Sequence, residues 1–487
     1  MIRNKWMKRV LGIVGAVAMA AVTAFSVPSY KIEVNAATPT IALEYCQLID
    51  QKTIRYKADL NVAPPSDDGM LYLFELKTYQ YEIPAESLPV ASTPITTDVT
   101  LKFELGSTSA MGRLYSKYAL ATRQGGKLVM LGNPQYISNP EMLAKKTVRK
   151  DRDRKTTQDQ WCTNVSLTGT GVGSVPVSHV QHTMQVLVKE GTVVTHPSVS
   201  DGTKDAHTWE HSFYMMNAAN DAGIQGLVAD LTNYAANSGA QDFIIGNEVN
   251  QRKWNYMAWT DWDSFVREYM QVFRVCYTAI KSQNAAANVY LSIDQCWDRN
   301  RPTSHAEYYS YIDAKDFLIK FNSMINAGGN INWNVACHPY TVPLTYSKFW
   351  DLSGCDVETP AYCRSQVADG HMMTFQNISL LTDLLSTTDF QDQSGHVRDI
   401  IINEIGIDAT HGEDNQIAAL CAAFKAFERH PQITQFIYLN NLGDGVDSRL
   451  SERGWEVFNA LGTPAEDQYM DWAKKHIGIT EWSEVLK

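Results

Sequence analysis

Two glutamates stand where buried strands are expected to end. Glu248 follows the apolar run DFII and a Gly-Asn pair, and Glu404 lies in IINEIG, directly after a second apolar run. In folds built from parallel strands and helices, the residues that follow the strands form the face where chemistry takes place. Two carboxyl groups there could share acid–base work, because one can donate a proton while the other attacks the substrate or activates water.

Other polar residues follow neighbouring apolar runs in the same half of the chain. Asp294 follows NVYLSI, His338 and Tyr340 follow WNVAC, and Asn440 follows FIYL. If these runs are parallel strands of one sheet, their carboxyl ends share an edge, and these side chains could line one site.

Each of these residues also has a structural interpretation. Glu248 could cap the next helix or pair with Arg252, and Glu404 could be a buried structural acid. In that second case Asp294 becomes the next candidate partner for Glu248. His338 could be a satisfied structural histidine, and Tyr340 could simply pack its loop.

The second part of the chain, residues 156–487, predicts a (β/α)8 TIM barrel, and therefore an α/β fold. Its strand-like runs alternate with segments of helical period, and near-continuous apolar strands joined by helices indicate a parallel sheet buried on both faces. With FIYL as the eighth strand, DFII becomes the fourth and DIII the seventh, so Glu248 and Glu404 could converge across the mouth of the barrel. The first three strands are sought in WCTNVSL, MQVLV and TVVTH. A doubly wound open sheet is the alternative.

The first part, residues 38–145, predicts an all-β sandwich domain. Short runs rich in β-formers are separated by turn residues, with Gly125-Gly126 as a hairpin turn. About six strands in about 110 residues are typical of a sandwich, and the architecture resembles the immunoglobulin-like or fibronectin-like modules attached to secreted bacterial enzymes. Lys145–Lys155 is interpreted as a charged linker, with a solvated helix face as the alternative. The six runs are TIALEYCQL, TIRYKADLNV, MLYLFELKT, TTDVTLKFEL, YSKYALATRQ and KLVMLGNPQYI.

The pair Asn247-Glu248 after the fourth expected strand, with Glu404 at the seventh, resembles the motifs of clan A glycoside hydrolases. Members of that clan are (β/α)8 barrels that cleave glycosidic bonds with retention of configuration. The resemblance covers residues of about 156 to 470. It implies that Glu248 is the acid/base, Glu404 the nucleophile and Asn247 a partner of the sugar 2-hydroxyl. It also implies substrate contacts from His338 and Tyr340, and carboxyl groups about 5–5.5 Å apart.

The chain departs from the clan at the end of the eighth strand, where a tryptophan often lies under the sugar. Here the sequence is FIYLNNLGDG. Trp297 or Trp254 could substitute as the substrate platform, because pyranose rings present apolar C–H groups to aromatic faces. Trp254 could equally pack the start of the next helix.

The N-terminal residues 1–36 predict a signal peptide, with a basic start, an apolar run and a small-residue cleavage site. An uncleaved membrane anchor is the alternative; otherwise we expect a secreted protein with no membrane contact after cleavage. The formal net charge is −11, which argues against binding nucleic acid. The eight cysteines form no CxxC pair; most are expected to be buried thiols, with Cys355 and Cys363 the best disulfide candidates.

Other chemistries lack their motifs. The sequence has no GxSxG elbow and no HExxH pair, so neither a serine hydrolase nor a zinc protease is expected. The sequence therefore predicts a secreted glycoside hydrolase acting on a β-linked oligosaccharide or polysaccharide, with no cofactor and no metal. The alternative is a non-catalytic carbohydrate-binding or cell-surface protein on a degenerate barrel.

Overall fold

The computed structural model describes residues 39–150, 154–158, 164–165, 175–176, 183–186, 218–219, 221–237, 240–251, 261–299, 311–356, 358–440, 442–443 and 446–487 of the 487-residue chain. The expected signal peptide, Trp254, Arg252 and the run TVVTH lie outside these residues. No helix within the described ranges is long and apolar enough to cross a membrane.

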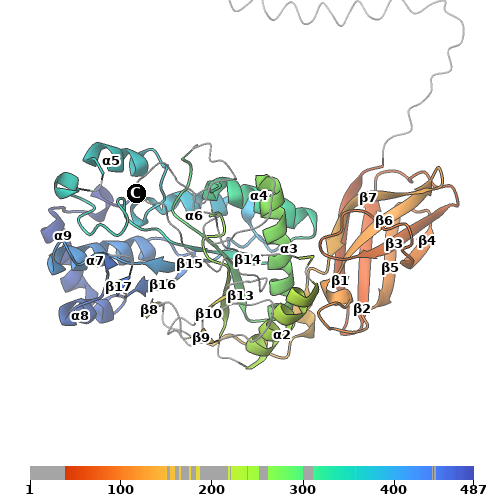
Figure 1. Ribbon diagram of the computed structural model, residues 1–487, viewed down its shortest axis with the longest axis horizontal. Helices are drawn as coiled ribbons and strands as arrows, with labels where there is room; N and C mark the ends of the chain where they lie inside the picture. The colour runs from red at the N-terminus through yellow and green to blue at the C-terminus, as the bar shows by residue number, and fades with distance from the viewer. Residues whose placement is uncertain are drawn as a thin grey trace, which may run out of the picture. The chain divides into compact units, whose positions relative to one another are not determined.

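The N-terminal region forms a three-stranded and a four-stranded antiparallel sheet, drawn in red and orange in Figure 1. All six expected strands are present. The seventh, β4, was missed because its prolines argue against a strand, yet at a sheet edge proline is tolerated. Gly125 and Gly126, with φ of 60° and 75°, make the tight turn between β6 and β7. The sheet orders are β1 (Ile41–Leu48), β2 (Thr53–Leu60), β5 (Asp98–Glu104), and β4 (Pro89–Pro94), β3 (Met70–Leu76), β6 (Lys117–Gln124), β7 (Lys127–Tyr136).

The C-terminal region is built on a seven-stranded parallel sheet. Its first strand in sequence, β8, pairs with its last, β16, which is the pairing expected in a barrel and not in a doubly wound sheet. The remaining strand of a closed barrel would fall between β8 and β11, outside the described residues. The strand order is β11 (Thr183–Val186), β12 (Asp242–Ile245), β13 (Asn288–Ile293), β14 (Trp333–Cys337), β15 (Ile400–Ile405), β16 (Ile433–Leu439), β8 (Lys155–Gln158).

The early strands differ from the sequence expectation. The first strand is β8, at the end of the charged stretch, and not the run WCTNVSL. Within the described residues, that run contributes β9 (Asn164–Val165), which pairs antiparallel with β10 (Val175–Pro176), apart from the parallel sheet. The run MQVLV overlaps β11, the neighbour of β12. Lys155–Gln158 escaped notice because its residues are polar, and its place in the sheet is set by pairing with the apolar β16.

Helices pack around the outer side of this sheet (Figure 1). Their apolar faces match the predicted helical periods. The helices are α2 (Asp221–Asn237), α3 (Trp262–Lys281), α4 (Ala314–Ala327), α5 (Pro360–Ala368), α6 (Ser379–Ser386), α7 (Glu413–Glu428), α8 (Glu452–Ala460) and α9 (Glu466–Ile477). Short elements complete the described chain: η1 (Arg113–Tyr115), η2 (Pro140–Leu143), η3 (Leu352–Gly354), η4 (Phe375–Asn377), η5 (Thr388–Phe390), η6 (Trp482–Glu484), β17 (Leu442–Gly443) and β18 (Val446–Asp447).

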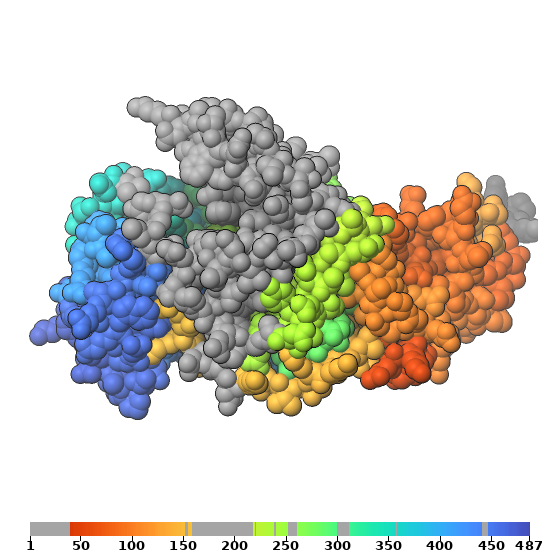
Figure 2. All heavy atoms as spheres, turned by 60° about the horizontal axis from the view of Figure 1, so that its bottom comes forward, coloured from red at the N-terminus to blue at the C-terminus, as the bar shows by residue number. Residues whose placement is uncertain are grey.

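The sandwich contacts α2 and α3. The yellow-green atoms of α2 lie against the orange atoms of the sandwich in Figure 2, and Lys77 of the sandwich pairs with Asp221 of α2 at 2.7 Å. The guanidinium of Arg274, buried in α3, lies 4.8 Å from the ring centre of Tyr136. The strands of the sandwich are therefore attached to the helical layer and not to the carboxyl ends of the parallel strands.

The inner face of the parallel sheet has an apolar layer between two polar ones. Side chains at alternate strand positions share a face, and one buried residue from each of β12 to β16 forms the middle layer: Ile244, Tyr290, Ala336, Ile401 and Ile437. Two positions earlier stand Asp242, Asn288, Asn334, Asp399 and Gln435. Two positions later, Ser292 and His338 begin the polar layer at the carboxyl ends.

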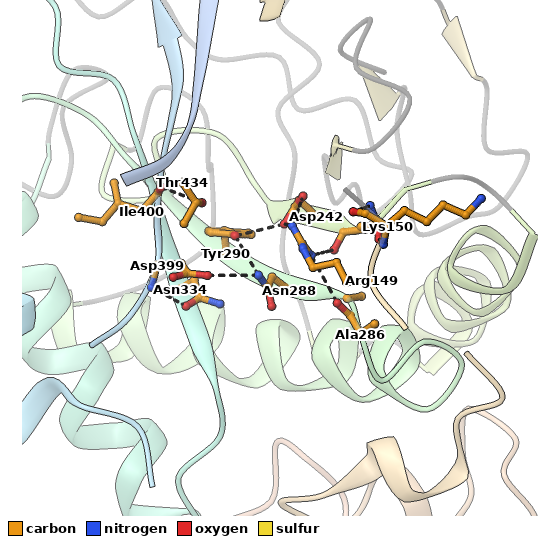
Figure 3. Close-up of polar contacts among 12 residues, drawn as sticks. Arg149, Lys150, Asp242, Ala286, Asn288, Tyr290, Asn334, Asp399, Ile400 and Thr434 are labelled. Carbon is orange, nitrogen blue, oxygen red and sulfur yellow. Dashed lines mark hydrogen bonds and ion pairs between the residues drawn. The ribbon is translucent and has the colours of Figure 1, made fainter. Parts of the chain in front are cut away.

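The first of these polar layers, which contains Asp242 and is called the lower layer below, binds part of the stretch that was interpreted as a charged linker (Figure 3). Arg149 donates two hydrogen bonds to the fully buried carboxylate of Asp242, at 2.7 and 2.8 Å. Its other terminal nitrogen donates to the carbonyls of Gln241 and Ala286. The backbone of Lys150 exchanges two further hydrogen bonds with the side chain of Gln241. This stretch is extended and anchored, and the helical alternative is wrong.

The cysteines are mostly buried, as expected, and those within the described residues are free thiols. Cys355 packs against Cys363 in a small cluster with Tyr346 and Leu352, but the two sulfurs are not bonded. The disulfide expected between them is therefore absent from this structure.

We expect Arg149→Gln to lower the free energy of unfolding by about 3 kcal/mol, because it leaves the buried Asp242 carboxylate without its cation. Urea unfolding followed by circular dichroism measures this loss. The matched control is Arg449→Gln, which breaks the much more exposed pair with Asp447 and should cost less than about 1 kcal/mol. Equal small losses in the two variants would show that Asp242 does not depend on Arg149.

Candidate active site

The carboxyl ends of three parallel strands bring Glu248, His338 and Glu404 together. Nδ1 of His338 lies 2.9 Å from Oε1 of Glu248 and 3.8 Å from Oε2 of Glu404. One carboxylate oxygen of Glu248 and one of Glu404 lie within 4.8 Å of each other. The two glutamates singled out from the sequence therefore converge, with an imidazole between them.

Glu248 is held in a turn that a glutamate rarely adopts. Gly246 has a φ of 84° and Glu248 a φ of 42°, and left-handed backbone costs a residue with a Cβ about 1 kcal/mol or more. The backbone N–H of Glu248 donates to Oγ of Ser292, and that of Val249 donates to the Ser292 carbonyl at 2.7 Å. Pairing with β13 thus fixes a strained turn, and such strain concentrates at functional sites.

His338 is positively charged at neutral pH. Its burial alone lowers the pKa, but the charge of Glu404, the hydrogen bond to Glu248 and the charges of Glu248 and Asp294 outweigh it and raise the pKa to about 9. Nε2, on the far side of the ring, lies 3.4 Å from Oγ of Ser292, and this oxygen can accept a hydrogen bond from the Nε2 proton. The imidazolium can therefore donate toward Glu248 and Ser292 at once.

Tyr340 fixes the second carboxylate. Its hydroxyl donates to Oε1 of Glu404 at 2.7 Å. Burial, followed by the charge of Glu404, raises the pKa of Tyr340 well above its ordinary value, so the phenol keeps the proton that it donates. Glu404 is thereby held by a neutral donor on one oxygen and faces the His338 cation with the other.

A third carboxyl group, that of Asp294, lies behind Glu248 and is more deeply buried. Asp294 is buried and accepts hydrogen bonds from Asn250 and Gln251, which follow Glu248 in sequence. Sequence reasoning named Asp294 as a spare acid but missed both amides and Ser292. Ser292 could have been found as the one serine in the apolar run NVYLSI, whereas the amides gave no recognisable pattern.

The remaining expected site residues are placed less directly. Asn247 is buried in the same turn as Glu248, so its position is compatible with a substrate contact. Trp297 is only 4% exposed and packs in the main hydrophobic core. Its ring is not presented to a ligand, because the residues after Asp294 turn back toward α4. Trp254 lies outside the described residues.

Glu248, His338 and Glu404 are also the described side chains that could meet on a metal ion. At neutral pH, however, the raised pKa of His338 keeps protons on both ring nitrogens, and a protonated imidazole has no lone pair for a metal. A cation would first have to displace that proton.

Comparison with known proteins identifies the family. The model of a family of unknown function, DUF5722, matches residues 172–485, more than half of the chain. The chain belongs to this family. No curated protein matches it.

Solved structures similar to this DUF5722 chain are glycoside hydrolases. A GH128 endo-β-1,3-glucanase from Sorangium cellulosum is 15% identical, with 49% of this chain and 77% of that chain covered and a TM-score of 0.30. A family 39 glycoside hydrolase from Bacteroides cellulosilyticus is 13% identical, with coverages of 86% and 79% and a TM-score of 0.35. Xylanase 10B from Thermotoga maritima is 11% identical, with coverages of 52% and 67% and a TM-score of 0.28. Scores this low do not bear on activity, which has to be inferred from the site itself.

The charge on His338 predicts a pH-dependent stability. Folding raises the pKa of His338 from 6.5 to about 9, so the protonated imidazole stabilises the fold. This stabilisation is fully present below pH 6.5 and is lost as the pH rises through 9. The unfolding free energy of the wild type should exceed that of His338→Asn by up to about 3 kcal/mol at pH 6, and this difference should close by pH 9.5. Urea titrations across this range measure it.

His430→Asn is the matched control. Burial lowers the pKa of His430, so its contribution to stability should fall as the pH drops, which is the opposite trend. A difference between wild type and His338→Asn that stays constant from pH 6 to 9.5 would show that His338 is neutral in the folded chain.

Proposed function

We propose that this chain is a secreted glycoside hydrolase that cleaves a β-linked glycan with retention of configuration. One observation carries the proposal: carboxylate oxygens of Glu248 and Glu404 lie within 4.8 Å of each other. Retaining enzymes hold their carboxyl groups about 5–5.5 Å apart, whereas inverting enzymes need about 6.5–9.5 Å to admit a water molecule. The short separation supports double displacement.

In the first step Glu404 attacks the anomeric carbon and forms a glycosyl-enzyme ester, while Glu248 gives its proton to the departing glycosidic oxygen. In the second step the Glu248 carboxylate takes a proton from water, and the resulting hydroxide oxygen displaces Glu404 from the anomeric carbon. The sugar leaves with its original configuration, and both carboxyl groups return to their starting states.

The neighbouring residues suit these roles. The hydroxyl of Tyr340 and the charge of His338 stabilise Glu404 as an anion, the form that a nucleophile requires. Asn247, beside Glu248, would hydrogen-bond the sugar 2-hydroxyl, as the resemblance to clan A implies. A neutral oligosaccharide or polysaccharide suits a chain with a formal net charge of −11, because a polyanion would be repelled.

The test is hydrolysis of aryl β-glycosides and of plant, fungal and bacterial polysaccharides by wild type, Glu248→Gln and Glu404→Gln. We expect both variants to lose activity on unactivated substrates by about 10³-fold or more, because each removes a group that acts in the transition state. Only Glu248→Gln should retain formation of the glycosyl-enzyme from dinitrophenyl glycosides, since a good leaving group needs no proton.

Glu141→Gln, which changes a largely buried carboxyl group outside the site, is the matched control and should keep wild-type activity. Circular dichroism establishes that each variant is folded. Activity that survives both substitutions would overturn the assignment of this pair. Binding of glycans without any hydrolysis by the wild type would favour the non-catalytic carbohydrate-binding protein instead.

A further inference from the structure

The carboxylate of Asp294 clamps the turn that carries Glu248. Its Oδ1 accepts from Nδ2 of Asn250 at 2.6 Å and from the backbone N–H of Cys296 at 3.0 Å. Its Oδ2 accepts from Nε2 of Gln251. In return, the backbone N–H of Asp294 donates to Oδ1 of Asn250 at 3.0 Å. The two residues that follow Glu248 by two and three positions are thus fastened to one buried acid.

These contacts stabilise the ionised form of Asp294, although its pKa is raised overall. The orientation of the Asn250 amide is fixed, because its oxygen receives the Asp294 N–H and its nitrogen also donates to the carbonyl of Ile312. The amides of Asn250 and Gln251 and the N–H of Cys296 then all donate to the Asp294 carboxylate, which suits the ionised form, because an ionised carboxylate accepts only. Burial and the charge of Glu248 raise the pKa of Asp294, while the three hydrogen bonds lower it.

The charged Asp294 faces Glu248 from the β13 side. Among the described residues, the other ionisable groups around Glu248 are His338 after β14 and Glu404 on β15, with Tyr340 beside Glu404. One imidazolium thus stands among three carboxyl groups. With Glu404 and Asp294 ionised, a proton on Glu248 keeps the cluster at a net charge of −1, and its loss would leave −2 in a largely buried space.

We propose that Asp294 is a positioning residue that holds the Glu248 turn and, through its negative charge, favours the protonated form of Glu248. It acts through Glu248, by fixing where that carboxyl group lies and by favouring a proton on it, and its charge also helps to raise the pKa of His338. The effect on catalysis rests on the proposed glycosidase function, whereas the effect on protonation does not.

The first experiment therefore needs no substrate. The full chain, labelled with carboxyl-¹³C glutamate, is titrated by NMR, and the Glu248 signal is assigned by its loss in Glu248→Gln. In Asp294→Asn the midpoint of the Glu248 titration should fall by about one pH unit, because a nearby negative charge is removed. An unchanged or higher midpoint would overturn the proposal even if the chain proves to be an active glycosidase.

The second experiment measures kcat/KM against pH. In Asp294→Asn the fall in activity on the alkaline side should move to lower pH by the same amount, while dinitrophenyl glycosides react nearly as fast as with the wild type. If kcat/KM instead falls equally on all substrates and the alkaline side of its pH profile does not move, Asp294 has only a structural role. If the wild type shows no activity, the proposed function is wrong, and the NMR titration alone then tests the proposed role of Asp294.

Two further variants keep the test decisive. Asp399→Asn, in the polar layer at the opposite end of the sheet (Figure 3), is the matched control and should leave the Glu248 midpoint in place. Gln251→Met removes one donor to Asp294 without changing the acid itself. Should Asp294→Asn fail to fold, Gln251→Met should still lower the Glu248 midpoint, by less, because a less stabilised Asp294 carries its charge for less of the time. No shift in Gln251→Met would then count against the proposal.

Discussion

The site depends on the positive charge of His338. Two carboxylates about 5 Å apart repel each other by about 3 kcal/mol at an effective dielectric constant of 20, and burial makes each of them costlier to ionise. The imidazolium lies 2.9 Å from Glu248 and 3.8 Å from Glu404, so it attracts Glu404 and also offsets the charge of Glu248 whenever Glu248 has lost its proton. Its ring is oriented by Ser292 on the side that faces away from the acids. Without this cation the two strand ends would favour a shared proton or a wider separation.

The layering of the parallel sheet explains why this polar cluster can exist inside a buried fold. Alternate residues of β13 read Asn288, Tyr290 and Ser292, so a polar, a mainly apolar and again a polar position face inward. The middle layer of apolar side chains separates the two polar layers. The lower layer uses its hydrogen bonds to hold strands and the Arg149 stretch together (Figure 3), while the upper layer presents its groups to the loops. The polar residues that hold the strands together and those of the candidate site therefore lie at opposite ends of the same sheet.

The sequence predicts those elements whose own residues show the pattern typical of the element. The strands β12 to β16 are apolar runs because a parallel sheet is buried on both faces, and the glutamates at their ends follow from that position. β8 could not be found, since Lys155–Gln158 is polar and becomes a strand only through its partner β16. Trp297 was misjudged because an aromatic ring suits a core as well as a sugar cleft. The charge of His338 depends on Glu248 and Glu404, which lie 90 and 66 positions away along the chain, and no local pattern encodes such contacts.

The two glutamates are held in ways that match different tasks. Glu404 lies within β15, where the register with β16 shifts between Ile402 and Ile405. It accepts a hydrogen bond from a buried phenol, and its side chain is 11% exposed. Glu248 lies beyond its strand in a strained turn, and its side chain is 19% exposed. A nucleophile has to remain an anion in one fixed place, whereas a group that exchanges protons with substrate and water needs access to both. Rigid hydrogen bonding therefore favours Glu404 as the nucleophile, and the more open turn, supported from behind by Asp294, favours Glu248 as the acid/base.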